Sequence, residues 1–205
     1  MKIEFEATFI DVDLDEIRRL LKELGARLVR PETLMKRVVF FPPVKIEGGW
    51  LRVRDEGDKV TMSLKQVLGD KIHDQKELEL EINSFEDGVK MLEMIGAKKK
   101  AYQESKRESW IYDVPDGGEV KVDIDTWPGF NPHVEVEGEN AEDVRMVSDK
   151  LGFDYAKAIH GAVDVIYGIK LGIPAAVIND QISELTFDNP PGRYAGKGVV
   201  RKIKK

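Results

Sequence analysis

Several segments of this chain alternate between apolar and charged residues. In residues 3–9 two glutamates alternate with isoleucine, phenylalanine and alanine, and in residues 77–82 three glutamates alternate with leucines and an isoleucine. Residues 120–125 and 133–137 repeat the pattern. Because side chains of a β-strand point alternately to opposite faces, this period of two predicts strands with one apolar and one acidic face. Nine acidic residues lie on these faces: Glu4, Glu6, Glu77, Glu79, Glu81, Asp123, Asp125, Glu135 and Glu137.

Two further predicted strands carry basic residues in the same way. In residues 50–54 two arginines alternate with leucine and valine, and in residues 59–66 Lys65 shares a face with threonine and serine. A charged sheet face is ordinarily solvated. A sheet that closes on itself, with helices over its apolar face, would instead gather these charges in a lumen. We favour the lumen, because the amphipathic helices of this chain need an apolar sheet surface to cover.

The chain is internally duplicated, with an offset of about seventy residues. Each half opens with a strand and an amphipathic helix; the helices follow Asp13 and Ser84, which are good N-cap types, and end at Gly25 and Gly96. A long strand with a Lys-Arg pair and two hairpin strands follow in each half. The resulting β-α-β-β-β units provide eight strands, enough to close a barrel. We therefore predict an α+β fold, an eight-stranded antiparallel β-barrel with helices packed outside.

After Gly138 the pattern becomes helical. It predicts a helix after Asn140, a second over about 157–171 that includes His160, and a short one after Pro174. The last residues are rich in proline, glycine and lysine, which is typical of a flexible basic tail. We expect a barrel domain over residues 1–172, followed by a short helix and tail over 173–205.

The composition of the chain excludes several kinds of binding surface and reactive site. The 205 residues carry a net charge of −6, which argues against a general nucleic-acid-binding surface. Because the chain has no cysteine, disulfides, thiolate metal sites and cysteine nucleophiles are excluded. There is no long apolar run and no signal-peptide core, so we expect a cytoplasmic protein that does not enter the membrane. A homodimer through the outer barrel wall is compatible with the sequence.

The order of the charged motifs resembles that of the CYTH, or triphosphate tunnel, superfamily over about residues 1–170. Its hallmark is E-x-E-x-K in the first strand; here Glu4 and Glu6 match, and Thr8 stands at the lysine position. The other matching segments are LRVR at 51–54, TMSLK at 61–65, ELE at 77–79, KR at 106–107, VDID at 122–125 and VEVE at 134–137.

The resemblance implies a tunnel in which basic residues bind a triphosphate while acidic residues hold Mg²⁺ or Mn²⁺. Arginine and lysine suit a phosphate chain, and carboxylates are hard ligands for these ions. Glu4 and Glu6 are the expected catalytic residues. The expected triphosphate-binding residues are Arg52, Arg54, Lys65, Arg107 and Lys121. The expected metal ligands are Glu4, Glu6, Asp123, Glu135 and Glu137.

Three activities remain open at this point. The first choice is hydrolysis of an inorganic, thiamine or nucleoside triphosphate. The alternative is cyclisation of ATP to cyclic AMP, as in class IV adenylyl cyclases. The third is non-catalytic binding of a nucleotide or polyphosphate, because Thr8 brings no charge where the family has lysine. Lys121 or Arg37 could supply that charge instead.

Overall fold

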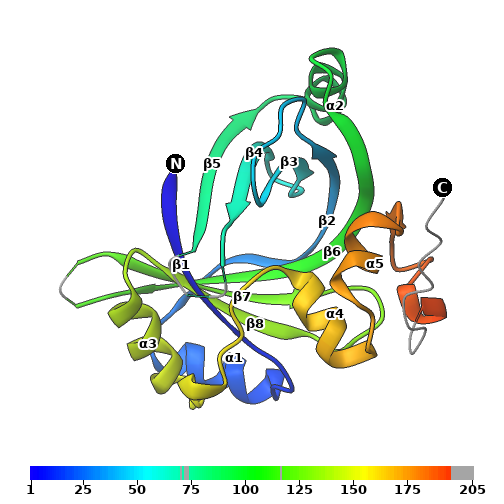
Figure 1. The fold of residues 1–205 in the computed structure, drawn as a ribbon. Coiled ribbons are helices and arrows are strands. Elements are labelled where there is room, and N and C mark those ends of the chain that lie inside the picture. Colours follow the sequence, from blue (N-terminus) through cyan, green and yellow to red (C-terminus); the bar gives the residue numbers. More distant parts are fainter. Residues whose placement is uncertain (70, 72–73, 116, 195–205) are drawn as a thin grey trace.

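The protein is described by a computed structural model, which covers residues 1–69, 71, 74–115 and 117–194. Eight antiparallel strands close into a barrel in the order β2-β3-β4-β5-β1-β8-β7-β6, and β6 pairs with β2 to complete the ring (Figure 1). The predicted fold is thus confirmed. The strands are β1 (Lys2–Phe9), β2 (Arg27–Phe41), β3 (Gly49–Asp55), β4 (Val60–Val67), β5 (Gln75–Ile82), β6 (Lys98–Asp113), β7 (Glu119–Thr126) and β8 (His133–Gly138).

The helices lie where the repeat places them. Each half follows the predicted β-α-β-β-β order, with α1 (Leu14–Glu23) in the first half and α2 (Phe85–Met94) in the second. Asp13 accepts hydrogen bonds from two backbone N–H groups of α1, and Ser84 accepts one from α2. These caps satisfy N–H groups that have no partner within the helix, and so they fix where each helix begins.

A C-terminal segment follows the barrel. It contains α3 (Ala141–Lys150), the 3₁₀ turn η1 (Tyr155–Lys157), α4 (Val163–Leu171), α5 (Ala175–Asp180), the short strand β9 (Glu184–Leu185) and the 3₁₀ turn η2 (Pro191–Tyr194). β9 pairs in parallel with β6 outside the ring. The predicted flexible tail falls largely on residues 195–205, which lie outside the described residues.

The helix predicted over 157–171 is wrong in its first part. Residues 158–162 are not helical, and Thr8 and Ile159 exchange two backbone hydrogen bonds of 3.0 and 2.9 Å. β1 pairs with β5 only over Lys2–Glu4, so the rest of its edge is open on that side, and Ile159 pairs with it there. Gly161 has a φ of 124°, which a right-handed helix does not allow. His160 therefore lies beside β1 and not in a helix.

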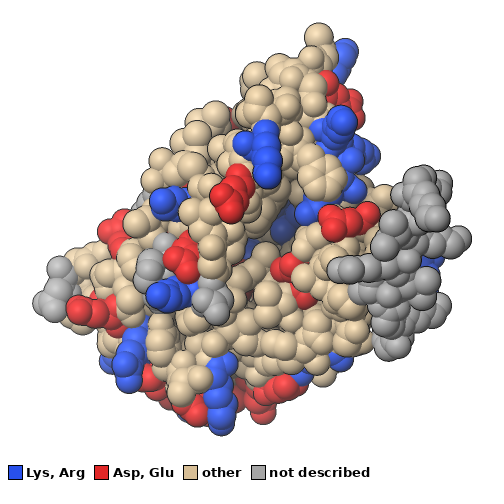
Figure 2. Space-filling view, in the orientation of Figure 1, with Lys and Arg blue, Asp and Glu red and all other residues tan. Residues whose placement is uncertain are grey.

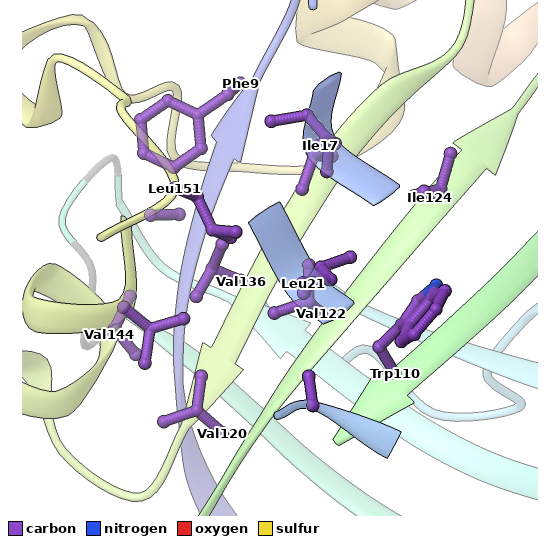
Figure 3. Packing of buried hydrophobic residues seen from close by; sticks show 14 residues of the cluster. Phe9, Ile17, Leu21, Trp110, Val120, Val122, Ile124, Val136, Val144 and Leu151 are labelled. Atoms are coloured by element: carbon purple, nitrogen blue, oxygen red, sulfur yellow. The ribbon is translucent and has the colours of Figure 1, made fainter. Parts of the chain in front are cut away.

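The main hydrophobic core lies outside the barrel, on its convex face. Valines of β7 and β8 pack against Ile17 and Leu21 of α1 and against Val144 and Leu151 at α3 (Figure 3). Helix α2 covers part of β3 through Leu92 and Val53. Leu78 and Leu80 on β5 stay 49% and 53% exposed, so the helices cover only part of the outer face.

A second core closes one side of the barrel. Trp127, which follows β7, packs with Tyr167 of α4 and with Ile178 of α5, and Leu185 of β9 joins the same cluster. The Tyr167 hydroxyl donates a hydrogen bond of 2.8 Å to the Pro128 carbonyl. The segment after α4 is therefore packed against the barrel. None of the helices in the described residues has both the length and the apolarity that crossing a bilayer requires.

The α1 contact with the barrel can be tested by truncation. Leu21 is fully buried in the main core, so Leu21→Ala removes packed methyl groups and leaves a cavity. We expect it to lower the free energy of unfolding by about 2–5 kcal/mol, measured by urea denaturation. Met94→Ala, at a 78% exposed position of α2, is the control and should change it by less than about 0.5 kcal/mol. Equal effects of the two substitutions would contradict the assigned core.

Candidate functional site

The charged faces of the strands meet inside the barrel, as predicted. They line a cavity of about 610 Å³. In Figure 2 the surface is hollowed near the centre of the face, and basic side chains are visible in its depth. The acidic side chains that line it are Glu4, Glu6, Glu77, Glu79, Asp125, Glu135, Glu137 and Asp164. The basic ones are Arg37, Arg52, Arg54, Lys65, Lys100, Arg107 and Lys121.

One wall of the cavity is an ion-pair ladder across β3, β4 and β5. The Arg52 Nη2 atom lies 2.8 Å from a Glu77 carboxylate oxygen and 3.4 Å from Glu79. The Lys65 Nζ atom lies 2.9 Å from Glu4 and 3.5 Å from Glu77. Burial would raise the pKa of Glu77, but Arg52 and Lys65 hold it below its ordinary value. Glu77 is therefore ionised and serves to neutralise the two cations.

Arg107 of β6 is the centre of a second cluster. Its guanidinium lies 2.5 Å from Asp123 and 2.7 Å from Glu135, and its Nε donates to Asp125 at 2.6 Å. Burial opposes the charge of Arg107, yet the three carboxylates raise its pKa above the ordinary value. Lys121 adds a further contact of 2.7 Å to Asp123. Arg107 is thus a permanent cation held by several strands.

The wall formed by β1 and β8 brings four carboxyl groups to the cavity, those of Glu4, Glu6, Glu135 and Glu137. Glu6 lies directly opposite Glu137 in the β1–β8 ladder. Burial and the neighbouring carboxylate of Glu135 raise the pKa of Glu6 to about 8, and only Lys65 opposes the shift substantially. Burial likewise raises the pKa of Glu4 to about 7, against the attraction of Lys65. Hard carboxylate oxygens that lack full neutralisation are suitable ligands for Mg²⁺ or Mn²⁺.

The residues that the sequence indicated are brought together, with two exceptions. Every predicted site residue except Asp123 lines the cavity. Asp123 is buried and is not among the lining residues; Arg107 and Lys121 both contact its Oδ2 atom, whereas its buried Oδ1 atom has no hydrogen-bond partner. Thr8 is also buried, under the Ile159 segment, and is not among the lining residues.

Glu56 was missed because it belongs to a predicted turn. The structure turns its side chain inward, where it is buried and accepts hydrogen bonds of 2.8 Å from both Arg30 and Arg54. These arginines and Lys59 outweigh burial and lower the pKa of Glu56 to about 2. The sequence did not predict these contacts, because nothing in the turn Asp-Glu-Gly-Asp shows whether its glutamate is exposed to solvent or buried.

Two histidines come close to the acidic wall. His133 is fully buried, and its ring nitrogens lie near Asp125 and Glu135, with the ligand atoms of all three within 4.8 Å of one another. Strand alternation places His133 on the face of Glu135, so the sequence held this signal. The His160 Nδ1 atom lies 2.9 Å from the Glu6 carbonyl oxygen, and His160 lines the cavity. Its place depends on the Thr8–Ile159 pairing, which no local pattern indicates.

Polar side chains from the C-terminal segment line the cavity beside α4 and α5. The Lys100 ammonium donates to the Asn179 side-chain oxygen at 3.0 Å, and the Asn179 amide donates to Asp164 at 2.6 Å. All three residues line the cavity. Burial lowers the pKa of Lys100, although Asp180 and Asp164 oppose the shift. The cavity thus combines a highly charged interior with a more neutral, hydrogen-bonding side.

Several solved structures have a fold similar to that of this barrel. No protein-family model and no curated protein sequence matches the chain. Among solved structures, a proposed adenylate cyclase from Vibrio parahaemolyticus aligns with a TM-score of 0.66 at 13% identity, over 82% of this chain and 98% of that protein. The PH1012 protein from Pyrococcus horikoshii OT3 aligns with a TM-score of 0.58 at 22% identity, over 76% and 94% of the two chains.

A third structure is HpAC1 from Hippeastrum, a proposed adenylyl cyclase with a dominant triphosphatase activity. It aligns with a TM-score of 0.55 at 16% identity, over 84% of this chain and 96% of HpAC1. The chain has the triphosphate tunnel fold. At these identities the likeness concerns the fold, and the tunnel interior of this chain has to be judged on its own residues.

The raised pKa values of the two tunnel glutamates on β1 predict how stability depends on pH. In the folded, metal-free protein Glu4 and Glu6 keep protons up to about pH 7 and 8, whereas unfolded glutamate loses its proton near pH 4.5. Their contribution to stability is complete below that pH and is lost as the pH rises through the folded values. We expect the free energy of unfolding to fall by on the order of 3 kcal/mol between pH 5 and 9.

The measurement is urea denaturation in EDTA at several pH values. Glu6→Gln carries no charge at any pH and should flatten the profile, while Glu81→Gln, at an exposed site on β5 outside the cavity lining, should leave it unchanged. A wild-type profile that stays level from pH 5 to 9 would contradict the raised pKa values.

Proposed function

We propose that this protein is a metal-dependent enzyme that processes a triphosphate in its tunnel, most simply by hydrolysis. The observation that carries the proposal is the division of charge in one cavity. Arginines and lysines are concentrated on β2, β3, β4, β6 and β7, whereas the adjacent strands β1 and β8 bring four carboxyl groups to the cavity, and those of Glu4 and Glu6 on β1 have raised pKa values. A phosphate chain needs the first set, and a divalent cation bound to it needs the second.

The basic residues would bind and orient the phosphate chain. Arg52 and Arg54 are two positions apart on β3, and side chains so placed are separated by roughly 7 Å, which suits contacts to neighbouring phosphoryl groups. Lys65, Arg107 and Lys121 extend the positive surface over β4, β6 and β7. Their carboxylate partners keep them in place, so little reorganisation is needed when negative charge develops on the reacting phosphate.

The acidic wall would serve as the metal site. Glu4, Glu6, Glu135 and Glu137 lie on the adjacent strands β1 and β8 and all line the cavity. Mg²⁺ or Mn²⁺ held there would neutralise phosphate oxygens and lower the pKa of an attacking water. Binding of the ion requires that Glu4 and Glu6 release their protons, so affinity for the ion should increase with pH. The same carboxylates can then accept a proton from the attacking water.

Cyclisation of ATP is the second candidate. The observation that favours it is the Lys100–Asn179–Asp164 group beside the charged interior, because a nucleoside has hydrogen-bonding groups that inorganic triphosphate lacks. The fold is compatible with both reactions. The solved structure from Vibrio parahaemolyticus is a proposed adenylate cyclase, and HpAC1 has a dominant triphosphatase activity. In cyclisation the ribose hydroxyl replaces water as the nucleophile and pyrophosphate leaves.

A product assay distinguishes the candidates. The purified protein is incubated with inorganic triphosphate, ATP or thiamine triphosphate, each with Mg²⁺ or Mn²⁺. We expect release of orthophosphate from at least one of them, which supports hydrolysis. Formation of cyclic AMP and pyrophosphate from ATP would instead support the cyclase. Calorimetric binding without any product would support a non-catalytic role, and neither binding nor product would refute the proposal.

Substitutions on β1 test the metal site. Glu4→Gln and Glu6→Gln each remove one carboxylate charge without changing the side-chain shape, and we expect metal-dependent turnover to fall by about 100-fold or more. Calorimetric titration with Mn²⁺ should show a parallel loss of affinity. Circular dichroism should remain unchanged, because these residues are outside the hydrophobic clusters. Glu81→Gln is again the control, and an equal loss of turnover in this variant would count against the assignment.

A further inference from the structure

We propose that His160 is a catalytic residue whose Nε2 atom accepts the proton that the attacking nucleophile releases. This inference rests on the proposed function, and it assigns the proton transfer to a side chain outside the acidic wall of β1 and β8. His160 belongs to the segment between η1 and α4, and it lines the cavity. Its imidazole is therefore part of the tunnel, although the residue comes after the last strand of the barrel.

The segment around His160 closes a gap in the tunnel wall. β1 pairs with β5 only over Lys2–Glu4, and farther along β1 Thr8 exchanges two backbone hydrogen bonds with Ile159. Backbone groups two residues apart point to the same side of a strand, so the Glu6 carbonyl lies at the same open edge. The His160 Nδ1 atom lies 2.9 Å from that carbonyl oxygen. The imidazole is thus bonded to the backbone of β1 at one of the proposed metal-binding residues.

The Glu6 carbonyl determines which ring nitrogen of His160 carries the hydrogen. A carbonyl oxygen can only accept a hydrogen bond, so Nδ1 is the protonated nitrogen, and Nε2 of the neutral ring keeps its lone pair. Within the described residues, no group forms a hydrogen bond with Nε2. A hydrogen bond at one ring nitrogen fixes the tautomer and orients the ring. The other nitrogen, in a side chain that lines the cavity, is then available as a base.

The carboxylates of the tunnel are less suitable proton acceptors. Glu77 is paired with Arg52 and Lys65, and Glu135 is paired with Arg107. These cations hold the pKa of both glutamates below the ordinary value, which makes the two carboxylates weak bases. A carboxylate that coordinates a divalent ion must also share its lone pairs with that ion. A neutral imidazole has neither constraint, and histidine is the side chain most often used for this step.

His133, the other histidine near the acidic wall, cannot take this role. It is fully buried and is not among the residues that line the cavity, so a nucleophile bound in the tunnel does not reach it. His160 is only partly buried and lines the cavity. The two histidines therefore differ in their access to the substrate, and only the position of His160 suits a base.

The proposed step is a displacement at phosphorus. In hydrolysis the oxygen of water forms a bond to the terminal phosphorus, and the bond from that phosphorus to the bridging oxygen breaks. One proton of the water passes to Nε2 of His160, and the remaining phosphate chain leaves with the electron pair of the broken bond. The imidazolium then releases its proton to the solvent. In cyclisation the same nitrogen would accept the proton of the ribose hydroxyl.

Two substitutions distinguish proton transfer from positioning of β1. The amide nitrogen of asparagine can take the place of Nδ1 and donate to the Glu6 carbonyl, so His160→Asn keeps this hydrogen bond but has no base. We expect its kcat, for the triphosphate that wild type turns over, to fall by about 100-fold. KM and the calorimetric affinities for Mn²⁺ and inorganic triphosphate should stay near the wild-type values, because the base acts only in the transition state. His160→Ala should lose as much, and added imidazole should restore part of its kcat.

Lys157→Gln, at an exposed site of η1, is the control and should keep the wild-type kcat. If wild type turns over a triphosphate and His160→Asn does so equally fast, His160 only positions the strand, and the inference is wrong while the proposed function stands. A loss of Mn²⁺ affinity in His160→Asn would also refute the inference, because His160 would then be a metal ligand. If wild type turns over none of the three triphosphates, both the inference and the proposed function are wrong.

Discussion

The burial of charge inside a closed barrel is the constraint on which the rest of the structure depends. A charged group that leaves water loses several kcal/mol of hydration unless an opposite charge and hydrogen bonds replace it. The tunnel meets this requirement by sharing partners: Arg107 contacts three carboxylates, and Glu77 contacts both Arg52 and Lys65. Such networks seldom increase stability over apolar packing. Their presence is better explained by a ligand that needs the charges than by folding.

The polar lumen also determines what lies outside the barrel. In most small barrels the inward side chains form the core, but here the inward positions carry charge and the apolar positions face outward. Helices must then cover the sheet, and α1 and α3 do so over β7 and β8 (Figure 3). Where no helix lies, as at Leu78 and Leu80, apolar side chains stay exposed. The charged lumen and the helices outside the barrel therefore both follow from the alternation of charged and apolar residues along the strands.

That alternation explains how much the sequence could predict. Period two located six of the eight barrel strands, and the N-caps located α1 and α2, because both signals are local. The long strands β2 and β6 were placed by the internal repeat and its Lys-Arg pair. The extent of β2 was not predictable in the same way. Pro31 cannot donate to a ladder, and the β2–β6 register is shifted around it, yet the strand continues on both sides. Pairing with the 16-residue β6 overrides the local signal for a break.

The contacts within the site could not be predicted from the sequence, for a related reason. Which acid meets which base depends on strand register and on side chains that reach across the lumen, and neither appears in a single strand. The Lys65–Glu4 contact joins β4 to β1, two strands away in the ring. His160 shows the other limit: its apolar neighbours favour a helix, but the open edge of β1 offers backbone hydrogen bonds that hold the segment extended.

The order of the strands around the ring places acidic and basic side chains on opposite walls of the lumen. β1 and β2 are four strands apart in either sense around the eight-stranded ring, so Glu4 and Glu6 lie across the barrel from Arg37. The β1 carboxyls have raised pKa values and the β2 guanidinium a lowered one, so on each wall the protein alone disfavours the charged form of these groups. Two such charges on opposite walls cannot pair directly. A divalent cation chelated by a phosphate chain, with its positive side toward β1 and its negative side toward β2, would satisfy both at once.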